Sequence, residues 1–228
     1  MTGKLYGIGV GPGDPELLTL KALRLIKESD VIAVPGKIPQ ETVAYKIVEG
    51  IYPELWKKEL LGIHMPMTKD AKVLKESHEE GVRRLCGKLE EGKVIAFLTL
   101  GDPTIYSTYS YLHMGVKKMG YSVEIVSGVP SFCAAAARMN SGIAEGAQQL
   151  HIIPASYETK MALALPGTKI LMKAGQRISD IKEQLNGCAA EICMVENCGM
   201  DGEHIYHGIE QMPETAGYYT LVIVKERL

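Results

Sequence analysis

Near its start the chain reads Gly7-Ile8-Gly9-Val10-Gly11-Pro12-Gly13-Asp14-Pro15. The apolar residues that lead into this stretch predict a strand that begins at Leu5. Asp14 followed by Pro15 is typical of a helix start, because aspartate caps helices and proline suits their first position. Four glycines at alternate positions let the backbone approach a ligand closely and adopt positive φ. The stretch therefore predicts a strand–turn–helix corner with room for a bound molecule.

The spacing of these glycines differs from the common nucleotide-binding fingerprints. A dinucleotide site requires Gly-x-Gly-x-x-Gly, but counting from Gly9 puts Asp14 at the position of the third glycine. Counting from Gly7 puts Pro12 there. The acidic residue that should end the second strand is also missing, since that strand ends at Pro35-Gly36, and no Gly-Lys-Ser/Thr of a Walker phosphate loop occurs. These differences weigh against a nicotinamide-dependent oxidoreductase, which we keep as an alternative.

Strand and helix patterns alternate through the N-terminal part of the chain. Val94–Thr99 is apolar up to its last residue, which is typical of a strand buried on both faces. The repeated strand–helix–strand order predicts a mainly parallel sheet with helices on its faces. Strands are expected at residues 5–10, 31–34, 94–99 and 123–126, and helices at residues 15–28, 41–50, 71–89 and 104–119.

The C-terminal part resumes this alternation and then departs from it. Strands are expected at residues 149–153, 169–172 and 191–195, and helices at residues 157–165 and 179–185. Residues 204–206 and 218–224 look like a strand pair with no helix between them, which predicts an antiparallel element. We therefore expect an α/β protein of two domains, residues 1–117 and 121–228, with mainly parallel sheets and an antiparallel C-terminal element.

Composition narrows the class of protein. The net charge is −2, from 25 basic and 27 acidic residues without a dense Lys/Arg block, which argues against nucleic acid as a partner. The apolar runs are too short to span a bilayer and no signal peptide is recognisable, so we expect a cytoplasmic protein without a membrane partner. None of the five cysteines forms a Cys-x-x-Cys pair, and His204 and His207 suit a surface or packing role, so we expect no metal site.

Two further segments share the small-residue character of the first. Gly101-Asp102-Pro103 follows a predicted strand, at the carboxyl end where open α/β sheets bind ligands. Asp102 is either the N-cap of the helix expected from Thr104 or a functional group. Ser127–Ala137 opens another predicted helix with small residues, which suits close packing against a helix or a ligand.

Together the three segments resemble the tetrapyrrole methylase family. Members typically begin with a strand, Gly-x-Gly-Pro-Gly-Asp and Leu-Leu-Thr-Leu-Lys, which correspond to Gly9–Asp14 and Leu17–Lys21 here. They also carry a Gly-Asp-Pro corner, here at Gly101–Pro103, and a turn before a small-residue helix, here within Ser127–Ala137. The order and the separations fit, and the resemblance covers nearly the whole chain.

Within the family, Gly101–Tyr109 and Ser131–Ala137 are most similar to the branch that methylates C-20 of precorrin-2 or cobalt-factor II in cobalamin biosynthesis. Ser107 stands where other branches usually have glycine. The resemblance implies a C-methyltransferase that uses S-adenosylmethionine (SAM), with a SAM cleft between two α/β domains, a tetrapyrrole substrate and a homodimeric assembly. A methylase acting at another ring position and a non-catalytic SAM-binding protein are the alternatives within this fold.

The resemblance also implies which residues line the SAM site. Asp102 and Tyr106 are the candidates for assisting removal of a proton from the methylated carbon. The implied SAM contacts are Pro12, Leu100, Gly101, Asp102 and Ile105, then Ser131, Phe132 and Met172, and finally Asn197, Cys198 and Thr220 near the adenine. Four basic residues are either partners of substrate carboxylates or solvated charges: Lys37, Arg138, Lys173 and Arg177.

Overall fold

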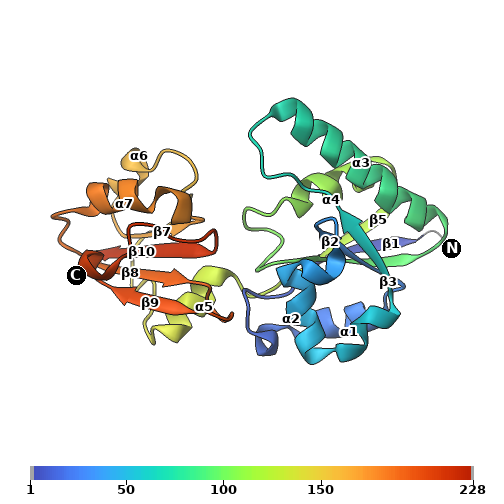
Figure 1. Ribbon diagram of the computed structural model, residues 1–228, viewed down its shortest axis with the longest axis horizontal. Coiled ribbons are helices and arrows are strands. Elements are labelled where there is room, and N and C mark those ends of the chain that lie inside the picture. Colours follow the sequence, from blue (N-terminus) through green and yellow to red (C-terminus); the bar gives the residue numbers. More distant parts are fainter. Residues whose placement is uncertain (1–2, 227–228) are drawn as a thin grey trace. The chain divides into compact units, whose positions relative to one another are not determined.

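The computed structural model describes residues 3–226 and divides the chain into two compact units, Met1–Pro130 and Ser131–Leu228. Figure 1 labels most of the helices and strands of both units. The predicted domains, 1–117 and 121–228, place the junction too early. Strand β5 (Ser122–Val126) pairs in parallel with β1 (Lys4–Gly9) and so belongs to the first unit.

The first unit contains a five-stranded sheet in the order β3-β2-β4-β1-β5. All four strand pairings are parallel, as the repeated strand–helix order predicts. Gly9 is opposite Thr99 and Ile8 is opposite Val126, so the carboxyl ends of β4, β1 and β5 reach the same edge. The remaining strands are β2 (Val31–Pro35), β3 (Glu59–Ile63) and β4 (Val94–Thr99).

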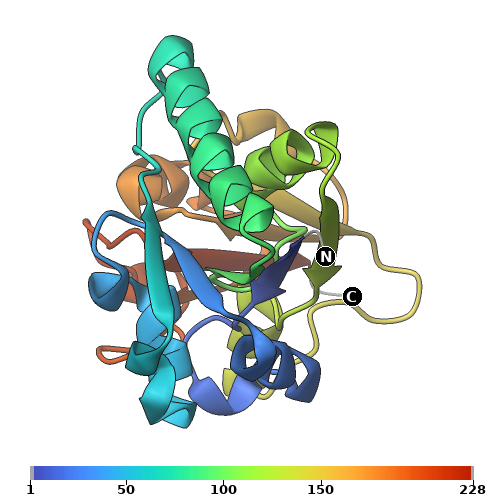
Figure 2. The same cartoon turned by 90° about the vertical axis from the view of Figure 1, so that its right-hand side faces the viewer.

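Helices cover both faces of this sheet, as Figures 1 and 2 show. Helices α1 (Leu20–Glu28) and α2 (Val43–Ile51) pack with Ile8, Ala96 and Leu98 on one face. On the other face, α3 (Ala71–Glu90) and α4 (Tyr109–Lys118) pack with Leu5, Ile95 and Phe97. The chain therefore leaves β1 toward one face and leaves β4 toward the other. Open α/β sheets bind ligands at such a switch point, outside the carboxyl ends of the two strands.

Local sequence explains where these helices start. The side chains of Thr19 and Thr42 accept hydrogen bonds from Ala22 N (3.2 Å) and Tyr45 N (3.3 Å) at the starts of α1 and α2. The predicted helix at residues 15–28 is therefore a 3₁₀ turn at Pro15–Leu17 followed by α1. Sequence analysis missed β3, an edge strand that pairs with β2 alone and has an exposed first residue.

The predicted helix at residues 104–119 begins later than expected, at Tyr109. Tyr106 has φ +46°, a left-handed conformation that a helix excludes. Asp102 closes a turn onto Thr104 instead of capping a helix there. The residues between β4 and α4 therefore form a shaped loop at the carboxyl edge of the sheet.

The second unit contains a five-stranded sheet in the order β6-β7-β10-β8-β9. The α/β class and the antiparallel C-terminal element are confirmed, but antiparallel pairing extends further than predicted. Only β6 and β7 are parallel, because β10 inserts between β7 and β8 and runs opposite to both. The two C-terminal strands, expected to pair with each other, both pair with β8. The strands are β6 (Leu150–Pro154), β7 (Thr168–Met172), β8 (Ala190–Glu196), β9 (His204–His207) and β10 (Thr220–Glu226).

Among the described residues, three α-helices accompany the second sheet. Helix α5 (Ser131–Arg138) opens the unit, and α6 (Lys160–Leu163) is a single turn. Helix α7 (Ile178–Leu185) buries Ile178, Ile181 and Leu185 in a core with apolar residues of β7, β8 and β10. The expected helices at 157–165 and 179–185 are thus present, the first of them shortened.

Glu124 on β5 links its own strand to β1 and α1 of the first unit. We expect the stability of the protein at low pH to depend on this carboxylate. Lys21 of α1 and Lys4 of β1 donate to its two carboxylate oxygens (2.8 and 2.7 Å), and these bonds lower the pKa of Glu124 from 4.5 to about 2. A carboxyl whose pKa is lower in the folded state stabilises the fold above pH 4.5 and loses that contribution as the pH falls toward 2.

We expect Glu124→Gln to lower the free energy of unfolding by about 1 kcal/mol at pH 7, since both ion pairs are partly exposed. The deficit should shrink below pH 4.5 and vanish near pH 2. Urea denaturation at several pH values measures this, with Glu28→Gln as the control because Glu28 forms one exposed pair with Arg24. A deficit that stays constant with pH would contradict the assignment.

Candidate functional site

Three backbone segments meet at the carboxyl ends of β4, β1 and β5. Gly101 N donates to Gly11 O (2.7 Å) and Gly11 N donates to Gly101 O (3.3 Å), so the loops after β1 and β4 form a short antiparallel bridge. A Cβ atom added to Gly9 would lie 2.5 Å from Gly101 O and 2.6 Å from Gly128 N. The first, second and third small-residue segments of the sequence are therefore packed backbone against backbone at one point.

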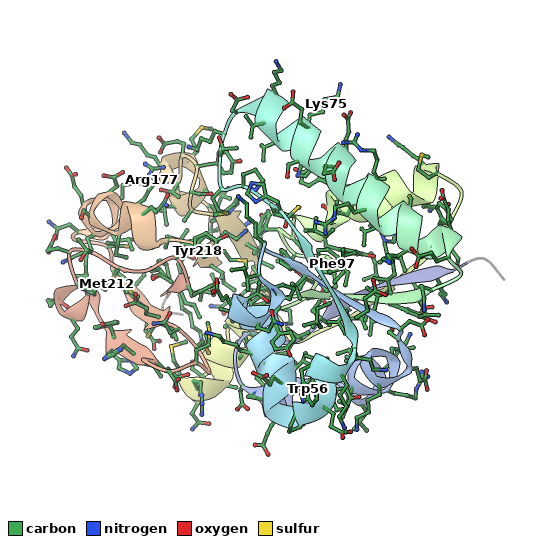
Figure 3. The ribbon with its side chains drawn as sticks, turned by 45° about the vertical axis from the view of Figure 1, so that its right-hand side comes forward. Trp56, Lys75, Phe97, Arg177, Met212 and Tyr218 are labelled. Carbon is green, nitrogen blue, oxygen red and sulfur yellow. The ribbon has the colours of Figure 1, made fainter. Side chains whose placement is uncertain are left out.

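The glycines of the first segment have different tasks. A Cβ on Gly7 would overlap the ring of Tyr109, which is fully buried and lies 5.2 Å from Phe97 between ring centroids (Figure 3 labels Phe97). Burial raises the pKa of the Tyr109 hydroxyl above its usual value. Gly7 thus serves core packing, whereas Gly9 serves the backbone crossing. Gly7 and Gly9 are therefore explained by packing within the protein, and this leaves Gly11 and Gly13 of the four alternating glycines for a ligand.

Gly101 borders open space. It has φ +69°, and the one atom of the described residues near an added Cβ is Val129 O, at 4.0 Å. The positive φ makes glycine the favoured residue, while the space beside it is free of side chains. Gly101 itself is buried, so this space lies beside a buried stretch of backbone at the switch point between β1 and β4.

The Asp102 carboxylate fastens the second segment to the third. It is 8% exposed, and its Oδ1 accepts from Thr104 N (2.8 Å) and Thr104 Oγ1 (2.5 Å). Its Oδ2 accepts from Gly128 N (3.0 Å). Both oxygens are engaged with groups of the chain, and Asp102 acts first as a bridge between two loops. Of the two alternatives for Asp102, the helix cap is wrong, because α4 begins only at Tyr109.

The other site residues predicted in the first unit lie along the same edge. Pro12 is buried beside Gly11, and Leu100 is half-buried against the core beneath α1 and α2. Ile105 is half-buried in the loop, and Tyr106 is 44% exposed. The structure thus brings Pro12, Leu100, Gly101, Asp102, Ile105 and Tyr106 to the ends of β1 and β4.

In the second unit the predicted residues gather at one end of the sheet. Met172 ends β7 opposite Leu221, and Thr220 begins β10 opposite Glu196, the last residue of β8. Asn197 N donates to Tyr219 O (3.0 Å). Because β10 runs opposite to β7 and β8, its start meets their carboxyl ends. Met172, Asn197, Cys198 and Thr220 therefore share one edge, whereas Ser131 and Phe132 begin α5.

Sequence analysis missed two groups at these edges. The hydroxyls of Thr99 and Ser107 are hydrogen-bonded (3.0 Å) across the loop after β4. In the second unit, Glu196 Oε1 accepts from Gly217 N (2.6 Å), and Gly217 lies so close to Gly175 that a Cβ on Gly175 would overlap it. One signal in the sequence indicated the pair Thr99 and Ser107, namely the serine at position 107 where glycine is usual. No signal indicated the contact between Glu196 and Gly217.

The four candidate basic residues have different surroundings. Arg138 pairs with Glu203 (3.2 Å) and Arg177 pairs with Asp180 (3.1 Å), so both arginines already have carboxylate partners. Lys173 lies 5.7 Å from the centroid of the Tyr218 ring, and Lys37 is exposed. Figure 3 labels Arg177 and Tyr218. The arginines are thus held by the protein itself, which favours a structural role for them.

Residues 3–226 contain neither a candidate metal site nor a candidate membrane-spanning helix. No group of three His, Cys, Asp or Glu side chains in this part of the chain is placed to hold a metal ion. None of its helices has both the length and the apolar character needed to cross a bilayer.

The chain belongs to the Tetrapyrrole (Corrin/Porphyrin) Methylases, whose pattern it matches over residues 4–212, which confirms the predicted family. It is 38% identical over 185 residues to the probable cobalt-precorrin-2 C(20)-methyltransferase of Methanocaldococcus jannaschii, covering 79% of this chain and 78% of the relative. It is 30% identical to the cobalt-precorrin-2 C(20)-methyltransferase of Salmonella typhimurium, covering 100% of this chain and 98% of the relative.

Solved structures agree with the fold. The native uroporphyrin-III C-methyltransferase of Thermus thermophilus superposes with a TM-score of 0.76 at 23% identity, covering 98% of both chains. A cobalt precorrin-4 methyltransferase gives a TM-score of 0.73 at 19% identity, covering 97% of this chain and 94% of that one. The Thermus enzyme has also been solved with S-adenosylhomocysteine, at a TM-score of 0.74 and 22% identity.

The bridge formed by Asp102 leads to a prediction. An amide at this position keeps one acceptor oxygen and points an NH₂ group at a backbone or hydroxyl donor. We expect Asp102→Asn to lower the free energy of unfolding by about 1–3 kcal/mol, measured by urea denaturation.

The matched control is Asp14→Asn. Asp14 Oδ1 accepts from Glu16 N (2.9 Å) at an exposed turn, where asparagine caps as well as aspartate. Equal and small losses in the two variants would mean that the bond from Gly128 N to Asp102 contributes little.

Proposed function

We propose that this protein transfers a methyl group from SAM to C-20 of precorrin-2 or its cobalt-bearing form in cobalamin biosynthesis. One observation carries the proposal: two relatives with that printed activity align with 79% and 100% of this chain. Relatives named for other substrates, a cobalt-precorrin-4 C(11)-methyltransferase and a uroporphyrinogen-III C-methyltransferase, align with 59% of it.

The residues of the first edge suit SAM. The free space beside Gly101 lets the backbone contact a ligand directly, and Ile105 offers an apolar surface next to it. SAM supplies an electrophilic methyl group on a sulfonium. We propose that it is held by Pro12, Leu100, Gly101, Asp102 and Ile105 of the first unit and by Ser131, Phe132, Met172, Asn197, Cys198 and Thr220 of the second. That residues of both units form one donor site stays a prediction from the resemblance.

The main contribution of the chain to such a reaction is positioning, because a carbon nucleophile and a sulfonium methyl react readily once aligned. The bridge formed by Asp102 fixes the wall next to Gly101. Its carboxylate already accepts three hydrogen bonds, which leaves Asp102 a weaker candidate for moving a proton. Tyr106, exposed at the same edge, is the stronger candidate for contacting the acceptor.

We also propose that the protein works in the cytoplasm as a homodimer. The described cysteines are all free thiols, which suits a reducing compartment. The dimer rests on the family resemblance. Light scattering of the purified protein tests it, and a monomeric mass at micromolar concentration would refute it.

The proposed reaction is tested by turnover. We expect incubation with ¹³C-methyl SAM and precorrin-2, metal-free or with cobalt, to give one new methyl group at C-20, located by NMR. Label at another carbon would make the protein a methylase of different regiospecificity. Binding of SAM without turnover would make it a non-catalytic binding protein, and binding of NAD(P) in place of SAM would support the oxidoreductase alternative.

The placement of the donor site is tested at Gly101. We expect Gly101→Ala to weaken S-adenosylhomocysteine binding about tenfold, equivalent to roughly 1.4 kcal/mol, because its methyl group enters the space where the ligand meets the backbone. Calorimetry measures this affinity.

Gly120→Ala is the matched control. Gly120 also has positive φ (+89°), and an added Cβ there meets no described atom within 4 Å, but it lies after α4, away from the carboxyl edge. Both variants carry the same kind of backbone strain, so both should lose similar thermal stability. Equal affinities in the two variants would place the donor elsewhere.

A further inference from the structure

The loop between β4 and α4 holds an aromatic residue in a costly conformation. Tyr106 has φ +46°, and a left-handed conformation costs a non-glycine residue roughly 1–2 kcal/mol. The residue is 44% exposed, so part of Tyr106 faces solvent at the carboxyl edge of the sheet. Strained residues persist where the surrounding structure determines them, and they cluster at functional sites.

Hydrogen bonds fix the loop on both sides of Tyr106. Before it, the Asp102 side chain holds Thr104, and Ile105 N donates to Asp102 O (3.3 Å). After it, the Ser107 hydroxyl is bonded to that of Thr99 (3.0 Å) and accepts from Tyr109 N (3.3 Å). The chain must therefore reverse at Tyr106 to bring Ser107 back to the end of β4.

The hydrogen bond between the hydroxyls of Thr99 and Ser107 connects the loop to the sheet. Thr99 is the last residue of β4 and is 7% exposed, so its hydroxyl is a fixed anchor on the sheet. Ser107 also holds the turn that leads into α4, since its carbonyl oxygen accepts from Ser110 N (3.3 Å) and Ser110 Oγ (2.9 Å). The start of α4 is therefore held by the bonds to the Ser107 carbonyl oxygen. The loop is connected to β4 by the hydrogen bond between the hydroxyls of Thr99 and Ser107.

We infer that Thr99 and Ser107 are positioning residues that hold Tyr106 in its left-handed conformation, so that its ring contacts the methyl acceptor. The inference rests on the proposed function and specifies the acceptor side of that site: a carboxylate-bearing tetrapyrrole that packs on the phenol ring. Thr99 and Ser107 act on the acceptor and leave the donor unaffected, because the backbone crossing beside Gly101 is held independently by Asp102.

The experiment is a double-mutant cycle of Thr99→Val and Tyr106→Gly. Valine keeps the shape of threonine and removes the hydroxyl, and glycine removes the ring and adopts positive φ freely. We expect Thr99→Val to lower kcat/KM for the tetrapyrrole roughly two- to tenfold, the value of one net hydrogen bond. The affinity for S-adenosylhomocysteine, measured by calorimetry, should stay unchanged. In the Tyr106→Gly background, Thr99→Val should have no further effect on kcat/KM.

Thermal unfolding gives a readout that does not need turnover. Tyr106→Gly should leave Tm unchanged or raise it, because glycine relieves the strain. Thr99→Val should lower Tm more in the Tyr106→Gly background than alone. In the wild-type background the loss of the hydrogen bond is partly offset, because the freed loop lets Tyr106 leave its strained conformation. With glycine at position 106 there is no strain to relieve. The matched control is Ser110→Ala, which removes the hydroxyl bond from the first turn of α4 to Ser107 O and should leave kcat/KM for the acceptor unchanged.

The outcomes separate the inference from the proposed function. Wild-type protein that methylates the tetrapyrrole, combined with additive effects of the two substitutions, overturns the inference alone. A fall in Tm for Tyr106→Gly, or equal losses of donor and acceptor binding in Thr99→Val, also overturns it. Wild-type protein without turnover overturns the proposed function and the acceptor role, while coupled Tm values would still support the hold of Thr99 and Ser107 on Tyr106.

Discussion

The first unit depends on one crossing of three backbones that leaves no room for side chains. Gly9 ends β1, and Gly101 and Gly128, from the loops after β4 and β5, lie directly against it. Parallel pairing brings strand ends to a common edge, but it does not make the loops beyond them converge. Here the glycine contacts allow the convergence, and the carboxylate of Asp102 holds it by accepting from Gly128 N.

This crossing explains why a rigid wall occurs at the switch point. Helices α1 and α4 leave toward opposite faces, so the carboxyl ends of β1 and β4 form the topological switch point of the sheet. Without the bridge between Gly11 and Gly101, the two loops would be separate and free to move apart. With it, they form a continuous backbone surface, to which Gly101 adds the free space that a ligand needs. Positioning of that kind suits a reaction whose main requirement is alignment.

The sequence was sufficient for most of the elements, but it missed β3 and was insufficient for the contacts between elements. Val94–Thr99 was predicted at its observed bounds, because an apolar run between polar residues is a local signal. The start of α4 was wrong, since Asp-Pro favours a helix locally, whereas Asp102 bonds to Gly128, 26 residues away. The insertion of β10 between β7 and β8 was also missed, because strand order is set by packing rather than by any one segment.

The same limit applies to the glycines. The alternating glycines of the first segment were interpreted together as room for a ligand. In the structure, Gly7 accommodates the Tyr109 ring and Gly9 accommodates the backbone of Gly128. The partner that each glycine approaches lies about 100 residues further along the chain, in a segment that the local pattern does not identify. Family resemblance succeeded in bringing the three segments to one site because it carries that long-range information.

The left-handed residues show what these strand ends require. Lys173 directly follows β7 and Asn197 directly follows β8, and both have positive φ, as Tyr106 does in the loop after β4. Glycine would adopt these conformations without strain, as it does at Gly101. For Tyr106 and Lys173 this conformation costs roughly 1–2 kcal/mol each, whereas asparagine adopts it more readily. At Gly101 the missing side chain leaves space beside the backbone, whereas Tyr106 and Lys173 carry a large side chain at a strand end in spite of that cost.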